Sequence, residues 1–388
     1  MGDAPELCSP EGQWVDDAQR CENLGCVNAT TCAVPTKVGV GDTFSCTLLS
    51  NGKIRCWGTG ANGQLGAGDG VTYAIPPVEV ASIGKATAFA VGSSHACAVD
   101  DSTHQVKCWG QNFAGQLGVD ASTDKAFTPI VTMASPIGTP YIISGYNSVA
   151  TSASQGCKGW GKNTGGVLAN NSSPILYTPT QLGLSFYLGH RSIGDIVACS
   201  DINNKISCWG QNDYGQINNT SIGTAYPNAQ IVFTPATPPT ALSVGSVGAC
   251  AVIGGKVTCW GTMAITSSNG TVSTYVTAPV EVAGITNAAD ISVGSQSICA
   301  RTTTGKLMCW GRNSEGQLGI ADSNGTSPAK VNTPTEVPGY SNVTDVSVSK
   351  SAHSCFIDSN KVYCMGGNLS GQLGYTGASS VKPVQVQF

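Results

Sequence analysis

Charged side chains are scarce in this chain. Only 11% of its 388 residues are Asp, Glu, Lys or Arg, against about 25% in a typical soluble domain. The formal net charge is −4, and no cluster of Lys or Arg interrupts the sequence. A nucleic-acid binder needs a basic stripe that neutralises phosphates, so the sequence argues against a nucleic-acid partner.

Long apolar runs are also absent. No run approaches the roughly 20 residues that cross a bilayer, so we expect no membrane span. Met1 is followed directly by Gly-Asp-Ala-Pro, without the apolar stretch of a signal peptide. If the protein is secreted, we expect this numbering to begin at or near the mature start.

Residues that carry chemistry are few. The chain has four His and no Gly-x-Ser-x-Gly elbow, His-Glu-x-x-His motif or phosphate-binding glycine loop. His95 and His353 each stand two residues before a repeated Cys, and this shared register favours a structural role over a catalytic one. We therefore predict no catalytic residue, no metal site, no cofactor and no enzymatic activity.

A repeat of about 50 residues runs through most of the chain. Cys-Trp-Gly or a close variant recurs at steps of 49 to 55 residues and is mostly followed by Asn-x-x-Gly-Gln-Leu-Gly. A period near 50 residues, rich in β-formers, fits one four-stranded propeller blade. We expect an all-β fold, a seven-bladed β-propeller over residues 34–388 with a short Cys-rich N-terminal segment over residues 1–33. The blade motifs centre on Trp57, Trp109, Trp160, Trp209, Trp260, Trp310 and Met365.

The repeat resembles that of the regulator-of-chromosome-condensation family. The resemblance rests on the Trp-Gly-x-Asn-x-x-Gly-Gln-Leu-Gly runs, such as Trp109–Gly118, and on Gly-x-x-His-x-Cys-Ala at Gly92–Ala98. It covers about nine-tenths of the chain and implies a propeller of a secreted, disulfide-rich branch. The family's founding member is a nuclear exchange factor, and other members are secreted, so the resemblance alone does not assign a function.

Six repeats contain two Cys, and hairpin register predicts that they pair. Gly254-Gly255 reads as a two-residue turn, which places Cys250 opposite Cys259. Directly opposed residues of an antiparallel pair lie about 4.5–5.5 Å apart at Cα, which suits a disulfide. Zinc would need four ligands at one place, and each repeat offers two. The six predicted disulfides are Cys46–Cys56, Cys97–Cys108, Cys199–Cys208, Cys250–Cys259, Cys299–Cys309 and Cys355–Cys364.

The third repeat has Gly159 where the second Cys should stand, and Cys157 lies two residues earlier. Four more Cys precede the propeller, so at least one of the five is left over. The alternatives are a tail bonded within itself with Cys157 buried, a bond to another chain, or a bond between the tail and Cys157. The unassigned or linking cysteines are Cys8, Cys21, Cys26, Cys32 and Cys157.

Asn-x-Ser/Thr signals are more frequent than composition predicts, and several fall in polar loops after the Gly-Gln-Leu-Gly segment. Asn368 also fits the signal, but it occupies the motif position of Asn112, so we expect its side chain to bond backbone in a turn. The expected N-glycosylation sites are Asn28, Asn170, Asn171, Asn218, Asn219, Asn269, Asn324 and Asn342.

Paired cysteines and glycosylation signals together favour an extracellular or cell-surface glycoprotein that acts by protein contact. The form we favour is a structural subunit of a filament, coat or appendage, with itself or another extracellular protein as partner. The alternative is a soluble binder, such as an adhesin, lectin-like module or enzyme inhibitor, using the loops 262–275 and 214–232 with Tyr226, Phe233 and Tyr275 nearby. The third is an intracellular exchange factor like the founding relative.

The ends of the propeller also give an expectation. Pro383–Phe388 reads as a strand, and we expect it to close the ring by pairing in a blade shared with the N-terminal part of the propeller, near Lys37–Gly41.

Overall fold

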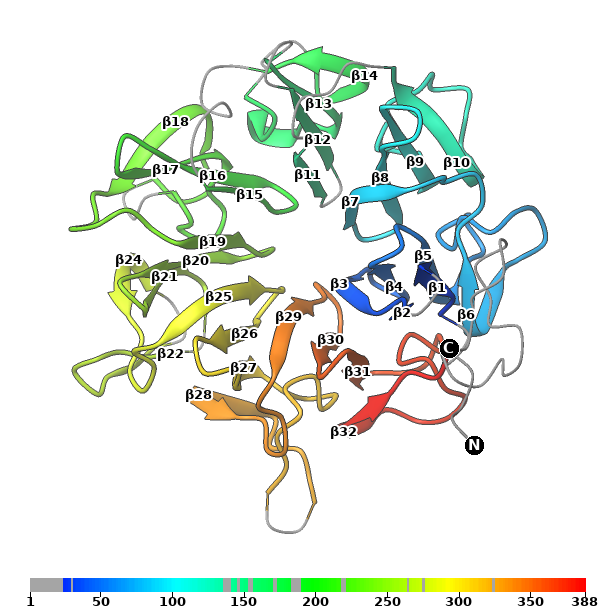
Figure 1. Cartoon of the computed structure of the whole chain (residues 1–388). Coiled ribbons are helices and arrows are strands. Elements are labelled where there is room, and N and C mark those ends of the chain that lie inside the picture. The colour runs from blue at the N-terminus through cyan, green and yellow to red at the C-terminus, as the bar shows by residue number, and fades with distance from the viewer. Residues whose placement is uncertain are drawn as a thin grey trace.

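The computed structural model describes residues 24–28, 31–134, 141–144, 147–152, 156–169, 173–182, 190–217, 221–263, 265–273, 276–322 and 325–388. The described strands form seven four-stranded sheets and two two-stranded sheets. The four-stranded sheets stand around a common centre, with one edge strand of each facing the middle (Figure 1). This arrangement is an all-β propeller.

Six of the four-stranded sheets carry a disulfide across their central hairpin, and we call these blades I to VI. Blade I is β3 (Pro35–Val40), β4 (Phe44–Leu49), β5 (Ile54–Thr59) and β6 (Tyr73–Glu79). Blade II is β7 (Ala86–Val91), β8 (His95–Asp100), β9 (Gln105–Gln111) and β10 (Lys125–Met133). Blade III is β15 (Arg191–Ile193), β16 (Val197–Ile202), β17 (Lys205–Gln211) and β18 (Ala225–Phe233).

The other three blades repeat this build. Blade IV is β19 (Ala241–Val244), β20 (Gly248–Ile253), β21 (Lys256–Gly261) and β24 (Val276–Glu281), with β22 (Ile265–Thr266) and β23 (Val272–Ser273) as a small side hairpin. Blade V is β25 (Ala288–Val293), β26 (Ser297–Thr302), β27 (Leu307–Arg312) and β28 (Lys330–Glu336). Blade VI is β29 (Val343–Val348), β30 (His353–Asp358), β31 (Lys361–Gly366) and β32 (Ser380–Gln385).

The expectation of seven blades needs correction here. The structure has six blades of one kind, and between blades II and III stands a four-stranded sheet of different build, which we call the unstapled sheet. It consists of β11 (Tyr141–Ser144), β12 (Asn147–Ser152), β13 (Gly156–Lys162) and β14 (Ile175–Gln181). The loop between β13 and β14 contains the 3-10 turn η1 (Thr164–Gly166). It has no disulfide, because Gly159 pairs with Val149 where the blades have two Cys.

Two-residue turns with positive φ set the register of the central hairpins. Gly254 and Gly255 have φ of 57° and 79°, and Asn203 and Asn204 have φ of 51° and 59°. Such turns match the twist of antiparallel strands. They bring Cys250 opposite Cys259, and Cys199 opposite Cys208.

The Gly after each Trp has a steric cause. Gly110 has a φ of 102°, and a Cβ there would lie 2.6 Å from the Ser94 carbonyl oxygen. The pairing with the fourth strand shifts register around the preceding Trp109, between Cys108 and Gly110. A side chain at this position would therefore collide with the neighbouring turn, which explains the Trp-Gly pair of the repeat.

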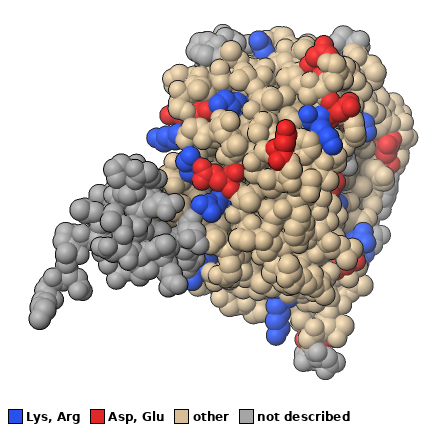
Figure 2. All heavy atoms as spheres, turned by 90° about the vertical axis from the view of Figure 1, so that its right-hand side faces the viewer, with Lys and Arg blue, Asp and Glu red and all other residues tan. Residues whose placement is uncertain are grey.

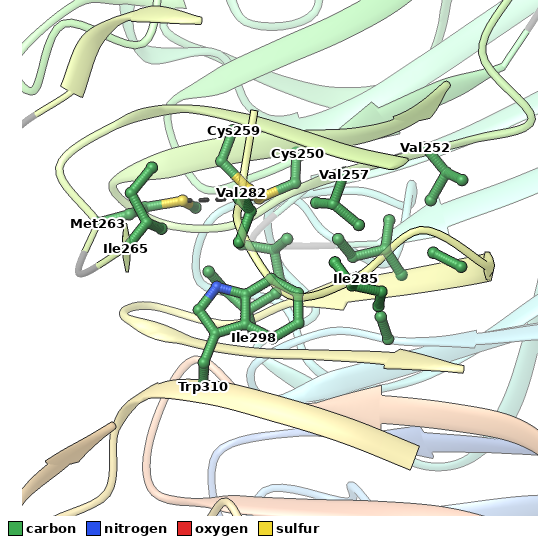
Figure 3. Packing of buried hydrophobic residues seen from close by; sticks show 14 of the residues in the cluster. Cys250, Val252, Val257, Cys259, Met263, Ile265, Val282, Ile285, Ile298 and Trp310 are labelled. Atoms are coloured by element: carbon green, nitrogen blue, oxygen red, sulfur yellow. Dashed lines mark hydrogen bonds between the residues drawn. A yellow bond between two sulfur atoms is a disulfide. The ribbon is translucent and has the colours of Figure 1, made fainter. Parts of the chain in front are cut away.

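The hydrophobic core lies between adjacent sheets. Between blades IV and V, the Cys250–Cys259 disulfide, Val257 and Ile285 pack with Trp310 of the next blade (Figure 3). Five indole N–H groups donate to a carbonyl of the preceding sheet, at 2.9 to 3.0 Å, which ties each sheet to its neighbour. The bonds run from Trp57 to Gln372, Trp109 to Gln64, Trp160 to Gln116, Trp209 to Val167 and Trp260 to Gln216.

The prediction of a shared closing blade is wrong. β32 pairs with β31 inside blade VI, and β3 pairs with β4 inside blade I. The repeat boundary falls after the fourth strand, so the two ends of the ring meet as complete blades. Side chains close the ring instead: Trp57 donates to the Gln372 carbonyl at 2.9 Å, and the Val38 N–H donates to Asp345 Oδ2 at 2.7 Å.

The described part of the N-terminal segment lies against blade I. β1 (Cys26–Asn28) pairs with β2 (Thr31–Cys32), and Leu24 and Ala33 pack on Leu49. Residues 1–23 lie outside the described residues. In the described parts of the chain, no helix is long and apolar enough to cross a membrane.

Candidate binding face

The meander topology sorts the loops of the propeller onto two faces. Consecutive strands within a sheet are antiparallel, so the turns between strands 1 and 2 and the loops between strands 3 and 4 lie at the same end. We call this end the loop face. The central hairpin turns lie at the opposite end, the hairpin face.

The Asn-x-x-Gly-Gln-Leu-Gly runs form the 3–4 loops, and their polar side chains hold the loop from inside. Asn112 Oδ1 accepts the Leu117 N–H at 2.9 Å, and Gln116 Oε1 accepts the Ala114 N–H at 2.7 Å. Both side chains are buried. The same Asn bond recurs at Asn163, Asn212, Asn313 and Asn368. The two x residues are consequently turned outward.

Apolar side chains occupy several of these outward positions. Phe113 is 63% exposed, Tyr214 is 40% exposed and Leu369 is fully exposed. Beside Phe113 lies a cavity of about 400 Å³ between blade II and the unstapled sheet, lined also by Pro174, Ile175 and Lys162. Exposed apolar groups next to a cavity are features of contact surfaces. The sequence reasoning missed these residues, although apolar residues at the x positions of a buried-Asn motif are a readable signal.

Charged side chains form no patch of one sign on the side of the molecule that Figure 2 shows. On the side of the molecule seen in Figure 2, Lys, Arg, Asp and Glu are sparse and the two signs are interspersed. On the hairpin face, several charges pair across strands, as in Lys256–Glu281 and Lys306–Glu336, at 3.1 and 2.8 Å. Exposed pairs of this kind contribute little to stability.

The structure joins the six cysteine pairs expected from register. Each pair lies directly opposite in its central hairpin, with Cα atoms 4.0 to 4.1 Å apart. All twelve cysteines are fully buried. Six buried disulfides in one chain suggest that the protein matures in an oxidising environment.

Cys157 is unbonded and fully buried. It stands three residues before Trp160, a position that Ile206 and Val257 fill in other blades. It packs with Leu182 and Ile193, and burial raises the pKa of its thiol to about 12, which the Arg191 charge opposes. This site suits a small hydrophobic residue and does not suit a link to another chain.

Of the N-terminal cysteines, Cys32 is disulfide-bonded, and its backbone pairs with that of Cys26. The Cys26 side chain and both Cys8 and Cys21 lie outside the described residues. Because Cys157 is free, the bond between the tail and Cys157 is absent from this structure.

Two expected glycosylation sites are described with their side chains. Asn269 and Asn342 are both exposed. Asn368 is 3% exposed, and its amide donates to the Tyr375 and Gly377 carbonyls at 3.0 and 3.1 Å, so it is a turn residue. The remaining expected sites, whose side chains lie outside the described residues, are Asn28, Asn170, Asn171, Asn218, Asn219 and Asn324.

The aromatic residues proposed for a soluble binder do not gather on a rim. Phe233 is half-buried and packs edge-on against Trp260, with ring centroids 5.5 Å apart, and Tyr226 packs in the same cluster. Tyr275 lies outside the described residues. Exposed aromatic groups of the loop face in the described residues include Phe113, Tyr214 and Tyr73, which begins β6 and is 50% exposed.

His95 and His353 occupy equivalent buried positions on the second strands of blades II and VI. His353 Nε2 lies 2.9 Å from Ser45 Oγ of blade I. Burial lowers the pKa of both imidazoles to about 3, so they are neutral at physiological pH. These properties fit core residues that join neighbouring blades.

Comparison with known proteins identifies the repeat. Two models described as regulator of chromosome condensation (RCC1) repeat match the chain, one at residues 36–64, 86–116 and 288–317, the other at residues 51–99 and 304–357. These matches support an RCC1-like β-propeller. The propeller superposes on yeast RCC1 (Prp20), solved bound to Kap60, with a TM-score of 0.70 at 19% identity over 91% of this chain and 85% of that one.

Proteins similar to this chain include a receptor, a ubiquitin-protein ligase and a further solved propeller. The ultraviolet-B receptor UVR8 of Arabidopsis thaliana is 26% identical over 370 residues, which cover 88% of this chain and 80% of that protein. The E3 ubiquitin-protein ligase HERC2 of Mus musculus is 25% identical over 337 residues, 82% of this chain but 7% of that protein. Human WBSCR16 shares the fold, with a TM-score of 0.72 at 15% identity over 86% of this chain and 94% of that one.

Proposed function

We propose that this protein is a secreted or cell-surface propeller that acts by contact with other proteins through its loop face. The observation that carries the proposal is the set of six buried hairpin disulfides. A reducing cytosol does not maintain such bonds, so they support an extracellular role over that of an intracellular exchange factor.

The form that we propose is a structural subunit of an extracellular filament, coat or appendage. The exposed apolar groups Phe113, Tyr214 and Leu369 on one face support self-association or contact with a second subunit. Cys157 is buried, so the contact we propose is non-covalent there. N-linked glycans at Asn269 and Asn342 would accompany this role.

Electron microscopy and size-exclusion chromatography of purified native protein test the assembly. In the absence of reductant we expect oligomers or filaments. The variants Phe113→Ser and Leu369→Ser should form smaller assemblies. Val131, which is 46% exposed on β10, provides the matched control as Val131→Ser. Monomers under all conditions would contradict the structural-subunit form.

A soluble binder is the second candidate, favoured by the cavity of about 400 Å³ beside Phe113. Pull-down from extracellular fluid distinguishes a soluble binder from a structural subunit. The Phe113→Ser protein should lose a partner that the wild type captures, and the Val131→Ser protein should keep it. A monomer that captures one partner through Phe113 supports the binder. Finding all 17 thiols free in native protein would contradict both extracellular forms.

A further inference from the structure

A second cavity lies at the centre of the ring. It measures about 160 Å³ and is lined by the ends of the innermost strands of all six blades, including Val40, Ile193, Val244 and Val348. These strands, β3, β15, β19 and β29, face the middle of the propeller in Figure 1. The 1–2 turns that follow them place the cavity toward the loop face.

Lys350, which lines this cavity, forms an ion pair across the ring. Lys350 Nζ lies 2.5 Å from Asp195 Oδ1, and the Ser246 hydroxyl donates to Asp195 Oδ2 at 2.8 Å. Lys350 belongs to blade VI and Asp195 to blade III, and two other blades separate them along the ring. The Lys350 charge is therefore already balanced by a fixed carboxylate, which argues against an anionic ligand.

Asp42, contributed by the 1–2 turn of blade I, is the carboxylate among the described residues that line the cavity. Among the described residues, no cation lies within 4.0 Å of it, so it has no direct ion-pair partner. With Asp195 and Lys350 paired, Asp42 gives the cavity one uncompensated negative charge at neutral pH. Asp42 is partly buried, and partial burial of an unpaired carboxylate has a cost that a bound cation would offset.

Ser93 supplies a second, independent feature. Its side chain lines the same cavity and the residue is 4% exposed. It faces Asp42 and lowers the pKa of that carboxyl, yet Ser93 Oγ has no partner with good hydrogen-bond geometry in the described parts of the chain. Buried hydroxyls normally have a partner, so this oxygen has a free position toward the cavity.

We propose that the central cavity binds one primary ammonium group carried on a flexible chain, with Asp42 as counter-ion and Ser93 Oγ as hydrogen-bond acceptor. A single positive charge balances the site, whereas a divalent cation would leave it with a net positive charge beside Lys350. The volume exceeds the ~30 Å³ of one water molecule and admits the ammonium head with a few methylenes. The valine and isoleucine walls suit those methylenes.

Binding should depend on the protonation of Asp42. Burial raises the pKa of Asp42 to about 6; Lys350 opposes this shift and Asp195 adds to it. His95, which Lys350 also influences, has a pKa of about 3 and stays neutral. Since only the ionised carboxylate attracts the cation, we expect affinity to fall as the pH drops from 7.5 to 5.

Calorimetric titration of the full chain with n-butylammonium at pH 7.5 tests the site. For a ligand this small we expect a saturable, roughly millimolar Kd, at least tenfold tighter than that of tetramethylammonium, which lacks N–H donors. Asp42→Asn should weaken binding at least tenfold, and Ser93→Ala by a smaller factor. Asp101→Asn, an exposed carboxylate on the hairpin face, should leave binding unchanged.

Thermal unfolding of each variant verifies folding, so a loss of binding in a folded Asp42→Asn protein supports the proposal. Two further probes distinguish the source of the ammonium. Binding of 1,4-diaminobutane alone indicates a free polyamine, and binding of N-acetyl-lysine methylamide as well indicates a lysine side chain. Absence of saturable binding by every amine, or equal binding by wild type and Asp42→Asn, would overturn the site.

Discussion

Blade IV and the unstapled sheet solve the same packing problem with different residues. In blade IV the facing positions of strands 2 and 3 hold Cys250 and Cys259, and a disulfide joins them. In the unstapled sheet the equivalent positions hold Val149 and Gly159. A Cβ added to Gly159 would lie only 2.7 Å from the Leu182 side chain. The unstapled sheet keeps the paired central hairpin and the buried Trp160 without a disulfide. The disulfides of the blades therefore reinforce a geometry that forms without them.

Removing one staple should produce the largest effect. In Cys250→Ala/Cys259→Ala, we expect the free energy of unfolding to fall by about 3 kcal/mol, because the disulfide closes a loop of about ten residues in the unfolded chain. Urea unfolding measures the change. Wild type in reductant loses all six staples and should be destabilised more than this variant. A loss near zero in the variant would show that this staple adds no stability.

Adding a staple should reverse part of this difference. Val149→Cys/Gly159→Cys places two cysteines in the register of the other six pairs. We expect a gain of about 1–2 kcal/mol, less than a native staple contributes, because Leu182 must move. Urea unfolding of the oxidised variant, compared with oxidised wild type and with the single variant Gly159→Cys, measures the gain. Failure to oxidise at all would mean that the backbone of the unstapled sheet differs from that of the blades.

The indole bonds extend the comparison to the joint between blades IV and V. Trp260 donates to the Gln216 carbonyl at 2.9 Å, whereas Trp310 Nε1 is buried without a partner in the described residues, since blade IV has Thr262-Met263 in place of Asn-x-x-Gly-Gln. Trp260→Phe should therefore cost about 1 kcal/mol more than Trp310→Phe. Equal losses in chemical denaturation would contradict a stabilising role for these bonds.

Cys157 gives the smallest expected effect. Cys157→Val restores the residue type that Val257 has in blade IV, and we expect a stability change below about 1 kcal/mol. The wild-type thiol should resist alkylation in native protein and react once the chain is unfolded, because it is buried. Rapid labelling of the native protein would place Cys157 outside the core.

The central hairpins of the blades could be predicted from sequence because residues close together in the chain determine them. Two-residue turns such as Gly254-Gly255 fix hairpin register, and the repeat spacing locates each Trp. The role of Cys157 was less readable, since one Cys fits a core position and a linking position equally well. Its place three residues before Trp160 decides the question once the blades are aligned.

Ring closure and the central cavity were not predictable in the same way. Pro383–Phe388 has the pattern of any fourth strand, and no local feature says which sheet it joins. Asp42, Asp195 and Lys350 are separated by more than 150 residues from one another, and only the circular arrangement brings the three charges near one another. Contacts across the ring depend on how many sheets it holds and on their tilt.

Non-reducing peptide mapping by mass spectrometry of the native protein tests the central claim most directly. We expect six disulfide-linked peptide pairs, each within one blade hairpin, a further disulfide at Cys32, and a free thiol at Cys157. Free thiols at the hairpin cysteines, or disulfides that join different blades, would contradict it.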